Sequence, residues 1–321
     1  MRLVFMGTPD FAVASLRALL EAGHEVVGVV TQPDRPRRRR SARPEPSPIK
    51  RQAASAALTI LQPERVGDPG FVEQLQELAP QTVVVVAYGQ ILPAEVLSIA
   101  PRWAINLHAS MLPYYRGAAP IARAIMAGEK VTGVTTMKMD RGLDTGDILL
   151  QKECAIGLTE TAGELTARLA VLGAGLLVET LDRHARGELE PRRQDHKTAT
   201  AAPPLSVEDG LIDWSDGAQA VASRVRGCNP WPLAYSFLRG EKVKILRAEE
   251  GFGGSGGGER GSPPGRVLAL DNERVLVRCQ GNSRVAISEM RFAGGRTMTA
   301  RDALNGRLIH VGETFARTSI G

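Results

Sequence analysis

The sequence predicts an α/β fold in its first part and a small all-β domain in its last part. Two observations support the α/β fold. Strand-like runs alternate with segments of helical periodicity, and the run at 82–88 ("TVVVVAY") is apolar throughout, which is typical of a strand buried on both faces. A third observation supports the all-β domain: short β-type runs follow one another closely after residue 230, as in a small barrel or sandwich. At 321 residues, two domains are expected.

The first elements define the sheet. A strand is expected at 3–6, then a turn and a helix that ends near Gly23, then a second strand at 25–32. Because a helix separates these two strands, they are predicted to pair in parallel. The remaining elements expected before residue 190 are helices at 49–60 and 68–80, strands at 82–88, 103–110 and 131–140, and a long helix ending near Gly187.

A polar, Pro-rich and unperiodic segment then predicts a linker. We therefore expect a catalytic domain at 1–189, a linker at 190–208 and a C-terminal domain at 209–321. Within the last, a short helix is expected first. Hairpin turns are predicted at Arg239-Gly240 and Gly281-Asn282, and Thr299 is predicted to cap a final helix. The strands are expected in the runs "AYSFL", "KVKILRAE", "GRVLALD", "RVLVRC" and "RVAISEMRF".

The basic character of the chain is local. Residues 34–51 hold eight basic and two acidic residues, whereas the whole chain has a formal net charge of only +5. Such a run is either a solvated surface loop or a site that neutralises several phosphates of a polyanion. Its like charges and four prolines predict that residues 35–43 are disordered when no partner is bound.

Several classes of protein are not favoured. The first strand-turn-helix, "VFMGTPDF", lacks the GxGxxG fingerprint of dinucleotide binding, and no phosphate-binding GxxxxGK[ST] occurs. The three cysteines and five histidines have no metal-ligand spacing, so no metal is expected. The cysteines stand far apart, which suits a reducing cytoplasm. No apolar run is long enough to span a membrane, and the N-terminus lacks the pattern of a secretion signal.

The stretch "NLHASMLPYYRGAAP" follows a predicted strand and concentrates polar groups. Because residues two apart in a strand point to the same face, Asn106 and His108 are expected side by side. Both could bond a developing oxyanion, and the histidine could carry a proton. Asp144, in a Gly-flanked turn, could orient His108 or hold a water, whereas Asp140 and Asp147 could instead be turn-forming residues. The set favours attack of a bound nucleophile on a bound carbonyl.

Seven motifs occur in the order and spacing of one family, from residue 4 to about 236. They are "VFMGTPDFAV", "VVTQPDRP", "VVVVAYGQILP", "NLHASMLPYYRGAAPI", "GLDTGDILL", "EDGLIDW" and "NPWPLAYS". Together they resemble the methionyl-tRNA formyltransferase family. The resemblance implies a Rossmann-like N-terminal sheet and an OB-like C-terminal barrel that packs against tRNA. It also implies transfer of a formyl group from 10-formyltetrahydrofolate to the amino group of methionine on the initiator tRNA.

The resemblance further implies roles for individual residues. Asn106, His108 and Asp144 would be the catalytic trio. The folate donor would contact two runs, namely Ser110, Met111, Leu112 and Pro113, and Tyr88, Gln90, Ile91 and Leu92. The loop at 34–49 would meet the acceptor end of the tRNA through Arg35, Arg37, Arg38, Arg39, Arg40 and Arg43. The enzyme is expected to be cytoplasmic and monomeric.

The chain departs from the family pattern outside the trio. Tyr114 and Tyr115 stand where Arg and Trp are common, and Ala201 and Pro204 stand where Tyr and Lys are common. Two other functions remain open. One is a formyltransferase acting on an amino sugar-nucleotide or another small amine, and the other is an RNA-binding protein with an inactive crevice. The arginine-rich loop favours a polyanionic substrate, and the intact trio favours an enzyme.

Overall fold

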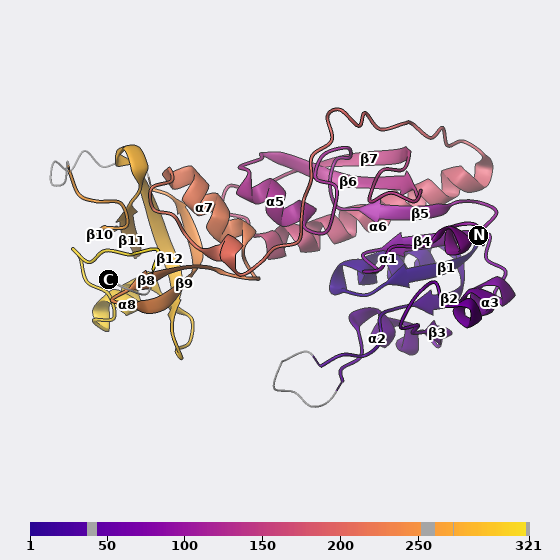
Figure 1. Ribbon diagram of the computed structural model, residues 1–321, viewed down its shortest axis with the longest axis horizontal. Coiled ribbons are helices and arrows are strands. Elements are labelled where there is room, and N and C mark those ends of the chain that lie inside the picture. The colour runs from indigo at the N-terminus through magenta and orange to yellow at the C-terminus, as the bar shows by residue number, and fades with distance from the viewer. Residues whose placement is uncertain (37–43, 252–260, 272, 319–321) are drawn as a thin grey trace. The chain divides into compact units, whose positions relative to one another are not determined.

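The computed structural model describes residues 1–36, 44–251, 261–271 and 273–318 (Figure 1). The chain forms two compact units, and it passes between them several times. Unit 1 comprises residues 1–118, 132–154 and 166–202, and unit 2 comprises residues 119–131, 155–165 and 203–321. The domain boundaries proposed at residues 189 and 208 stay a prediction.

Unit 1 is built on a seven-stranded sheet with the order β3-β2-β1-β4-β5-β6-β7. The pairs among β3, β2, β1, β4 and β5 are all parallel, as the α/β pattern predicted, whereas β6 runs antiparallel to β5. Strands β3 and β7 are not among the predicted strands, and Ile60 of β3 lies at the end of the helix predicted at 49–60. The strands are β1 (Arg2–Gly7), β2 (Glu25–Val30), β3 (Ile60–Leu61), β4 (Thr82–Val86), β5 (Ala104–His108), β6 (Val131–Lys138) and β7 (Ile148–Ala155).

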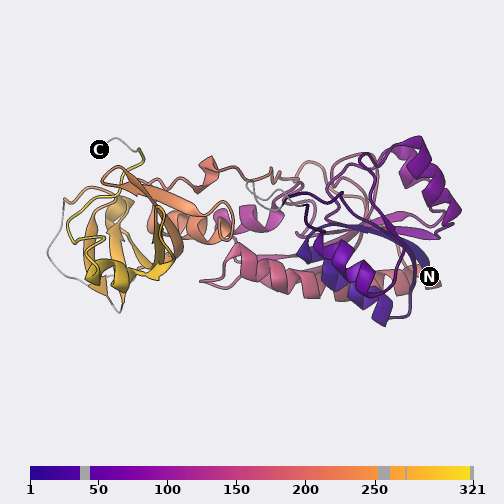
Figure 2. The same cartoon turned by 90° about the horizontal axis from the view of Figure 1, so that it is seen from below.

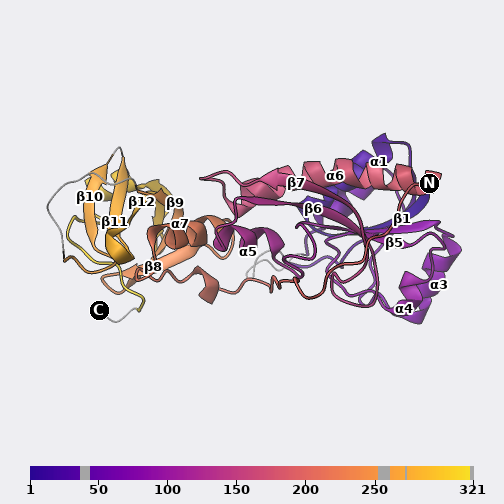
Figure 3. The same ribbon diagram turned by 90° about the horizontal axis from the view of Figure 1, so that it is seen from above.

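Helices cover both faces of this sheet, which explains why its central strands are apolar without interruption. Figure 3 shows α1 and α6 on one side and α3 and α4 on the other. Phe71 and Leu75 of α3 pack in one buried cluster with Val4 and Val83. On the opposite side, a Cβ at Gly173 of α6 would lie 2.8 Å from Leu107 of β5. The helices are α1 (Asp10–Glu21), α2 (Pro48–Ser55), α3 (Pro69–Glu77), α4 (Ala94–Leu97) and α6 (Ala162–Arg186).

Unit 2 contains an antiparallel sheet with the order β10-β11-β12-β9-β8, and β13 pairs with β12 (orange to yellow in Figure 2). This agrees with the expected small barrel-like domain of short strands. Its strands are β8 (Ala234–Leu238), β9 (Glu241–Glu250), β10 (Val267–Asp271), β11 (Arg274–Arg278), β12 (Arg284–Phe292) and β13 (Met298–Thr299). Its helices are α5 (Pro120–Met126), α7 (Ala218–Gly227) and α8 (Ala300–Asn305), with short 3-10 turns η1 (Glu208–Gly210) and η2 (Gln280–Asn282).

The turns and the helix cap predicted for unit 2 are found in the structure. Arg239 and Gly240 join β8 to β9 with positive φ at both positions (51° and 78°), as a tight hairpin turn requires. The Thr299 hydroxyl accepts a hydrogen bond from the Asp302 amide at 3.0 Å, so the predicted cap of α8 is confirmed. The predicted hairpin turn at Gly281-Asn282 is confirmed as well, because these residues belong to the 3-10 turn η2 that joins the antiparallel pair β11 and β12.

Candidate active site

Strand β5 presents the polar pair. It lies between β4 and β6, and all five of its residues are buried. Leu107 faces α6, so the side chains of Asn106 and His108 point to the opposite face of the sheet. Their residues are 8% and 6% exposed, although both are polar. Burial of two polar groups on one face calls for hydrogen-bond partners, and those partners define what the site is able to do.

His108 has a polar group beside each ring nitrogen. Its Nε2 lies 3.0 Å from the carbonyl oxygen of Tyr115, and its Nδ1 lies 3.6 Å from Oδ2 of Asp144. A carbonyl oxygen only accepts hydrogen bonds, so Nε2 carries the proton. In the neutral ring Nδ1 is then the free acceptor. A proton on Nδ1 would face the Asp144 carboxylate, 3.6 Å away.

Asp144 is held in an unusual backbone conformation. Its φ is +54°, the left-handed region that non-glycine residues rarely occupy. From there its side chain, 12% exposed, accepts a hydrogen bond from the Gly117 amide at 2.8 Å. Asp140 instead accepts from the Gly142 amide and the Thr145 hydroxyl within its own turn. The structure thus brings Asp144 to His108 and leaves Asp140 as a turn-forming residue.

Asn106 differs from its two neighbours in the set. Within the described parts of the chain, its side-chain amide makes no hydrogen bond, despite the burial of the residue. The residue is 8% exposed, and its side-chain amide is not among the fully enclosed polar groups that lack a partner, so the amide can be reached from outside the core. The amide N–H of Asn106 is therefore free to donate to a substrate oxygen.

The run at 110–113 is fixed by bonds to its surroundings. The fully buried Ser110 donates from its hydroxyl to the Tyr114 carbonyl at 2.6 Å. The Leu112 amide donates to Oγ1 of Thr135, and its carbonyl accepts from Nε2 of Gln151 at 2.8 Å. Met111 and Pro113 remain partly exposed. The side chains of Ser110 and Leu112 are thus committed inward, and the backbone and Met111 and Pro113 are left to meet a ligand.

The second predicted run follows β4, the neighbour of β5. Tyr88 and Leu92 are buried in the core, and burial raises the pKa of the Tyr88 hydroxyl to about 12. The Gln90 side chain accepts from the Val66 amide at 2.9 Å and donates to the Glu64 carbonyl at 3.2 Å. Ile91 is 73% exposed. Ile91 is therefore the side chain of this run that is presented to the surface.

The predicted arginine loop is described only at its base. Arg37, Arg38, Arg39, Arg40 and Arg43 lie outside the described residues, as does the expected disorder of most of 35–43. Arg35 is exposed, and its carbonyl accepts a hydrogen bond from the Glu45 amide at 3.2 Å, which closes the base of the loop. Beside it, the hydrogen bond from Lys50 holds the pKa of the Asp34 carboxyl below its usual value.

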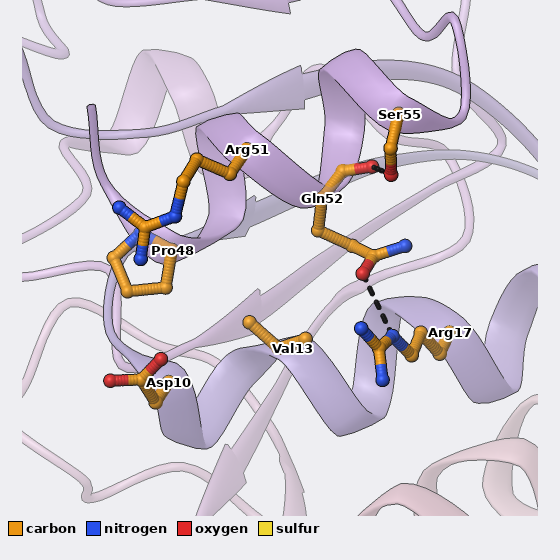
Figure 4. Close-up of a pocket in the computed structure, with 7 residues that line it drawn as sticks. All are labelled: Asp10, Val13, Arg17, Pro48, Arg51, Gln52 and Ser55. Carbon is orange, nitrogen blue, oxygen red and sulfur yellow. Dashed lines mark hydrogen bonds between the residues drawn. The ribbon is translucent and has the colours of Figure 1, made fainter.

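Two surface hollows lie elsewhere on unit 1. One, of about 310 Å³, lies between α1 and α2, where Arg17 donates to Gln52 at 2.7 Å (Figure 4). The other, of about 570 Å³, lies beside α4 and includes Asp140 and Arg141. Neither includes Asn106, His108 or Asp144. Among the described residues, no cluster of metal-ligating side chains and no helix able to span a membrane is found.

Comparison with known proteins places the chain in a known class. Residues 1–181 match the family model "Formyl transferase", and residues 204–308 match "Formyl transferase, C-terminal domain". The fold and the matched models define the chain as a formyl transferase.

Two curated relatives narrow the class. The methionyl-tRNA formyltransferase of Citrifermentans bemidjiense is 47% identical, covering 97% of this chain and 95% of that protein. That of Heliobacterium modesticaldum is 48% identical, covering 98% and 100%. The chain belongs to the methionyl-tRNA formyltransferase family.

Solved structures agree on the fold. The N-formyltransferase from Helicobacter canadensis, in complex with folinic acid and dTDP-3-aminofucose, has a TM-score of 0.69 at 17% identity. The alignment covers 89% of this chain and 98% of that one. HypX from Aquifex aeolicus, in complex with tetrahydrofolic acid, has a TM-score of 0.64 at 21% identity. The alignment covers 97% of this chain and 48% of the HypX chain.

Proposed function

We propose that this chain transfers the formyl group of 10-formyltetrahydrofolate to the free amino group of methionine on initiator methionyl-tRNA. The observation that carries the proposal is the 47–48% identity, over nearly the whole chain, to proteins named methionyl-tRNA formyltransferase. The polar set on β5 supplies chemistry that suits acyl transfer. In particular, no covalent enzyme intermediate is needed, because both substrates are bound and one carries the nucleophile.

The first step is attack of the unprotonated methionyl nitrogen on the formyl carbon. A new C–N bond forms, and the carbonyl electrons move to the oxygen, giving a tetrahedral oxyanion. The amide N–H of Asn106, unpartnered among the described residues and buried, donates to this oxygen. A donor that meets the charge only as it develops lowers the barrier, because it is worth more in the transition state than in the ground state.

The second step moves a proton. Attack leaves a positive charge on the amine nitrogen, and His108 accepts its proton at Nδ1. The carboxylate of Asp144, 3.6 Å away, stabilises the imidazolium and holds a water in the relay. The C–N bond to the folate then breaks, its electron pair stays on the folate nitrogen, and His108 returns the proton there. No net proton is consumed.

The donor is proposed to bind along the two runs that flank β5. Residues 110–113 offer a backbone fixed by hydrogen bonds, with Met111 and Pro113 partly exposed, and residues 88–92 offer the exposed Ile91 as an apolar contact. Two structural neighbours, solved with folinic acid and tetrahydrofolic acid, support a folate at this fold. The remaining side chains of both runs support this surface from behind.

The tRNA acceptor is proposed to be bound by electrostatic attraction between its phosphates and basic side chains. Arginines in the 34–49 loop would neutralise phosphates at the acceptor end of the tRNA, and unit 2 would contact the tRNA as well. All three groups of the trio belong to one copy of the chain, so a monomer is sufficient for the reaction. We propose a cytoplasmic location, because translation initiation takes place there.

One assay tests the proposal. Formyl transfer from 10-formyltetrahydrofolate is measured with charged initiator tRNA and, in parallel, with amino sugar-nucleotides. We expect turnover with the tRNA only. Turnover with an amino sugar-nucleotide and none with the tRNA would replace this proposal with the small-amine alternative. Inactivity with both acceptors, combined with tRNA binding, would favour an RNA-binding protein.

A further inference from the structure

The segment 192–202, which we name the strap, is hydrogen-bonded along both loops that carry the site. At one end, Arg192 and Ile148 exchange two backbone hydrogen bonds of 2.8 Å. At the other end, the Arg116 amide donates to the Thr200 carbonyl at 2.8 Å, and the Ala202 amide donates to the Arg116 carbonyl at 2.6 Å. The strap therefore connects the loop after β5 to the turn that contains Asp144, and all of these residues belong to unit 1.

One side chain joins the two loops through the strap. Gln194 is only 6% exposed. Its Nε2 donates to the carbonyl of Asp144 at 2.9 Å and to the carbonyl of Gly146 at 2.7 Å. Its Oε1 accepts from Nε and Nη2 of Arg116, at 3.0 and 2.6 Å. A primary amide has two N–H groups and two lone pairs on its oxygen, so every hydrogen bond that Gln194 is able to make is made.

The hydrogen bonds donated by Gln194 restrain the turn that orients the Asp144 side chain. Asp144 has a positive φ, which is disfavoured for a residue with a side chain and persists only when the surroundings hold it. Gln194 fixes the peptide groups that follow Asp144 and Gly146. The Asp144 carboxylate is thereby held where Oδ2 meets the Gly117 amide at 2.8 Å and faces Nδ1 of His108.

The geometry points to Gln194 as a positioning residue for the reaction: it holds the Asp144 turn so that the carboxylate is aimed at His108. We place its effect on the reaction in the Asp144 turn, while its bonds to Arg116 anchor the amide to the loop after β5. The effect on turnover rests on the proposed function, whereas the effect on the position of the carboxylate does not. A purely structural Gln194 would instead stabilise the strap without altering where Asp144 points.

The kinetic test is a double-mutant cycle with Asp144. Gln194→Met keeps a similar volume and removes all four hydrogen bonds. We expect kcat to fall on the order of 10- to 100-fold, as for a displaced catalytic group, while KM for the folate stays near the wild-type value. In an Asp144→Asn background the same change should cost no further activity, because its route of action is already lost. Equal losses in both backgrounds would overturn the proposal.

Thr180→Val is the matched control. Thr180 is fully buried in α6, within unit 1, and its hydroxyl bonds Oγ1 of Thr136 at 2.8 Å. The change removes a buried hydrogen-bonding group at constant shape and should lower the melting temperature without lowering kcat. If Thr180→Val loses as much kcat as Gln194→Met, general destabilisation explains the result and the positioning role is refuted.

A second measurement needs no turnover. The Gly117 amide is protected from hydrogen exchange by the Asp144 carboxylate, and the Arg116 and Ala202 amides are protected by the strap backbone. In Gln194→Met, residue-resolved exchange should speed up at Gly117 and stay slow at Ala202. Unchanged protection at Gly117 would refute the positioning role, even if the wild-type protein proved to have no formyltransferase activity. If Gln194→Met does not fold, Gln194→Glu serves, because it keeps the acceptor for Arg116 and loses both donated bonds.

Discussion

Replacement of Asn106 with Ala tests the proposed oxyanion donor most directly. Loss of one such donor raises the barrier by roughly 3–4 kcal/mol, which corresponds to about 10²- to 10³-fold in kcat. The structure predicts little effect of Asn106→Ala on stability. The Asn106 side chain makes no hydrogen bond within the described chain, so its removal leaves no protein group without its partner. We therefore expect kcat to fall by this factor with little loss of stability.

The assay is single-turnover formyl transfer with saturating folate and charged initiator tRNA, together with thermal unfolding. Ile105→Val is the matched control, because Ile105 is a fully buried neighbour on β5 whose side chain points to the opposite face. That change should cost about 0.5–1.5 kcal/mol of stability and leave kcat unchanged. Turnover of Asn106→Ala at the wild-type rate, or equal loss in both variants, would refute the assignment of Asn106.

Three further predictions use other parts of the molecule. Gly117→Ala should lower both kcat and melting temperature, because φ is +119° and a Cβ would lie 2.7 Å from the Ala202 carbonyl oxygen; unchanged values would show that this loop adapts. The hydrogen bond from Arg247 lowers the pKa of Glu164 to about 2, below its usual 4.5. Its stabilisation is therefore present above pH 4.5 and lost as pH falls towards 2. Because both side chains are exposed, urea unfolding of Glu164→Gln at pH 7 should show a loss below about 1 kcal/mol that disappears in acid. Replacement of Arg37–Arg40 with Gln should weaken the salt dependence of tRNA binding, measured by filter binding at rising salt. The slope of log K against log salt concentration should become less negative by up to about 0.9 for each phosphate that the loop no longer neutralises. An unchanged slope would exclude the loop from the interface.

Local patterns were sufficient to predict β1, β2, β4 and β5 of the parallel half of the sheet and the pair on β5, but not the two-residue strand β3. An uninterrupted apolar run indicated the buried strand β4, and the period of two placed Asn106 and His108 on one face. The same patterns missed β7. Its residues Ile148–Ala155 become exposed and charged towards the end, at the edge of the sheet, where a strand needs no continuous apolar run. Edge strands are thus the least visible part of such a sheet in sequence.

The position of Asp144 shows a different limit. From the sequence, a turn after a strand is expected to bring the carboxylate to His108. Because β6 is antiparallel to β5, however, its last residue, Lys138, pairs with Ile105 near the start of β5. The turn therefore has to return along β5 before Asp144 reaches His108. A Gly-flanked turn predicts a reversal of the chain but does not indicate its path.

The strap holds the turn that carries Asp144 on its path, and the sequence of the strap does not indicate this role. "RRQDHKTATA" is polar and unperiodic, the pattern that predicts a linker, although it bonds to the two loops through its backbone and through the side chains of Gln194, His196 and Thr200. Backbone hydrogen bonds leave no trace in residue type, and a buried Gln in sequence is indistinguishable from an exposed one. The contacts of Gln194 with Asp144 and Arg116 span 50 and 78 residues. Residues so far apart in sequence come into contact only when the whole sheet has packed. A site that depends on such contacts is therefore only partly predictable from the motif that carries its catalytic residues.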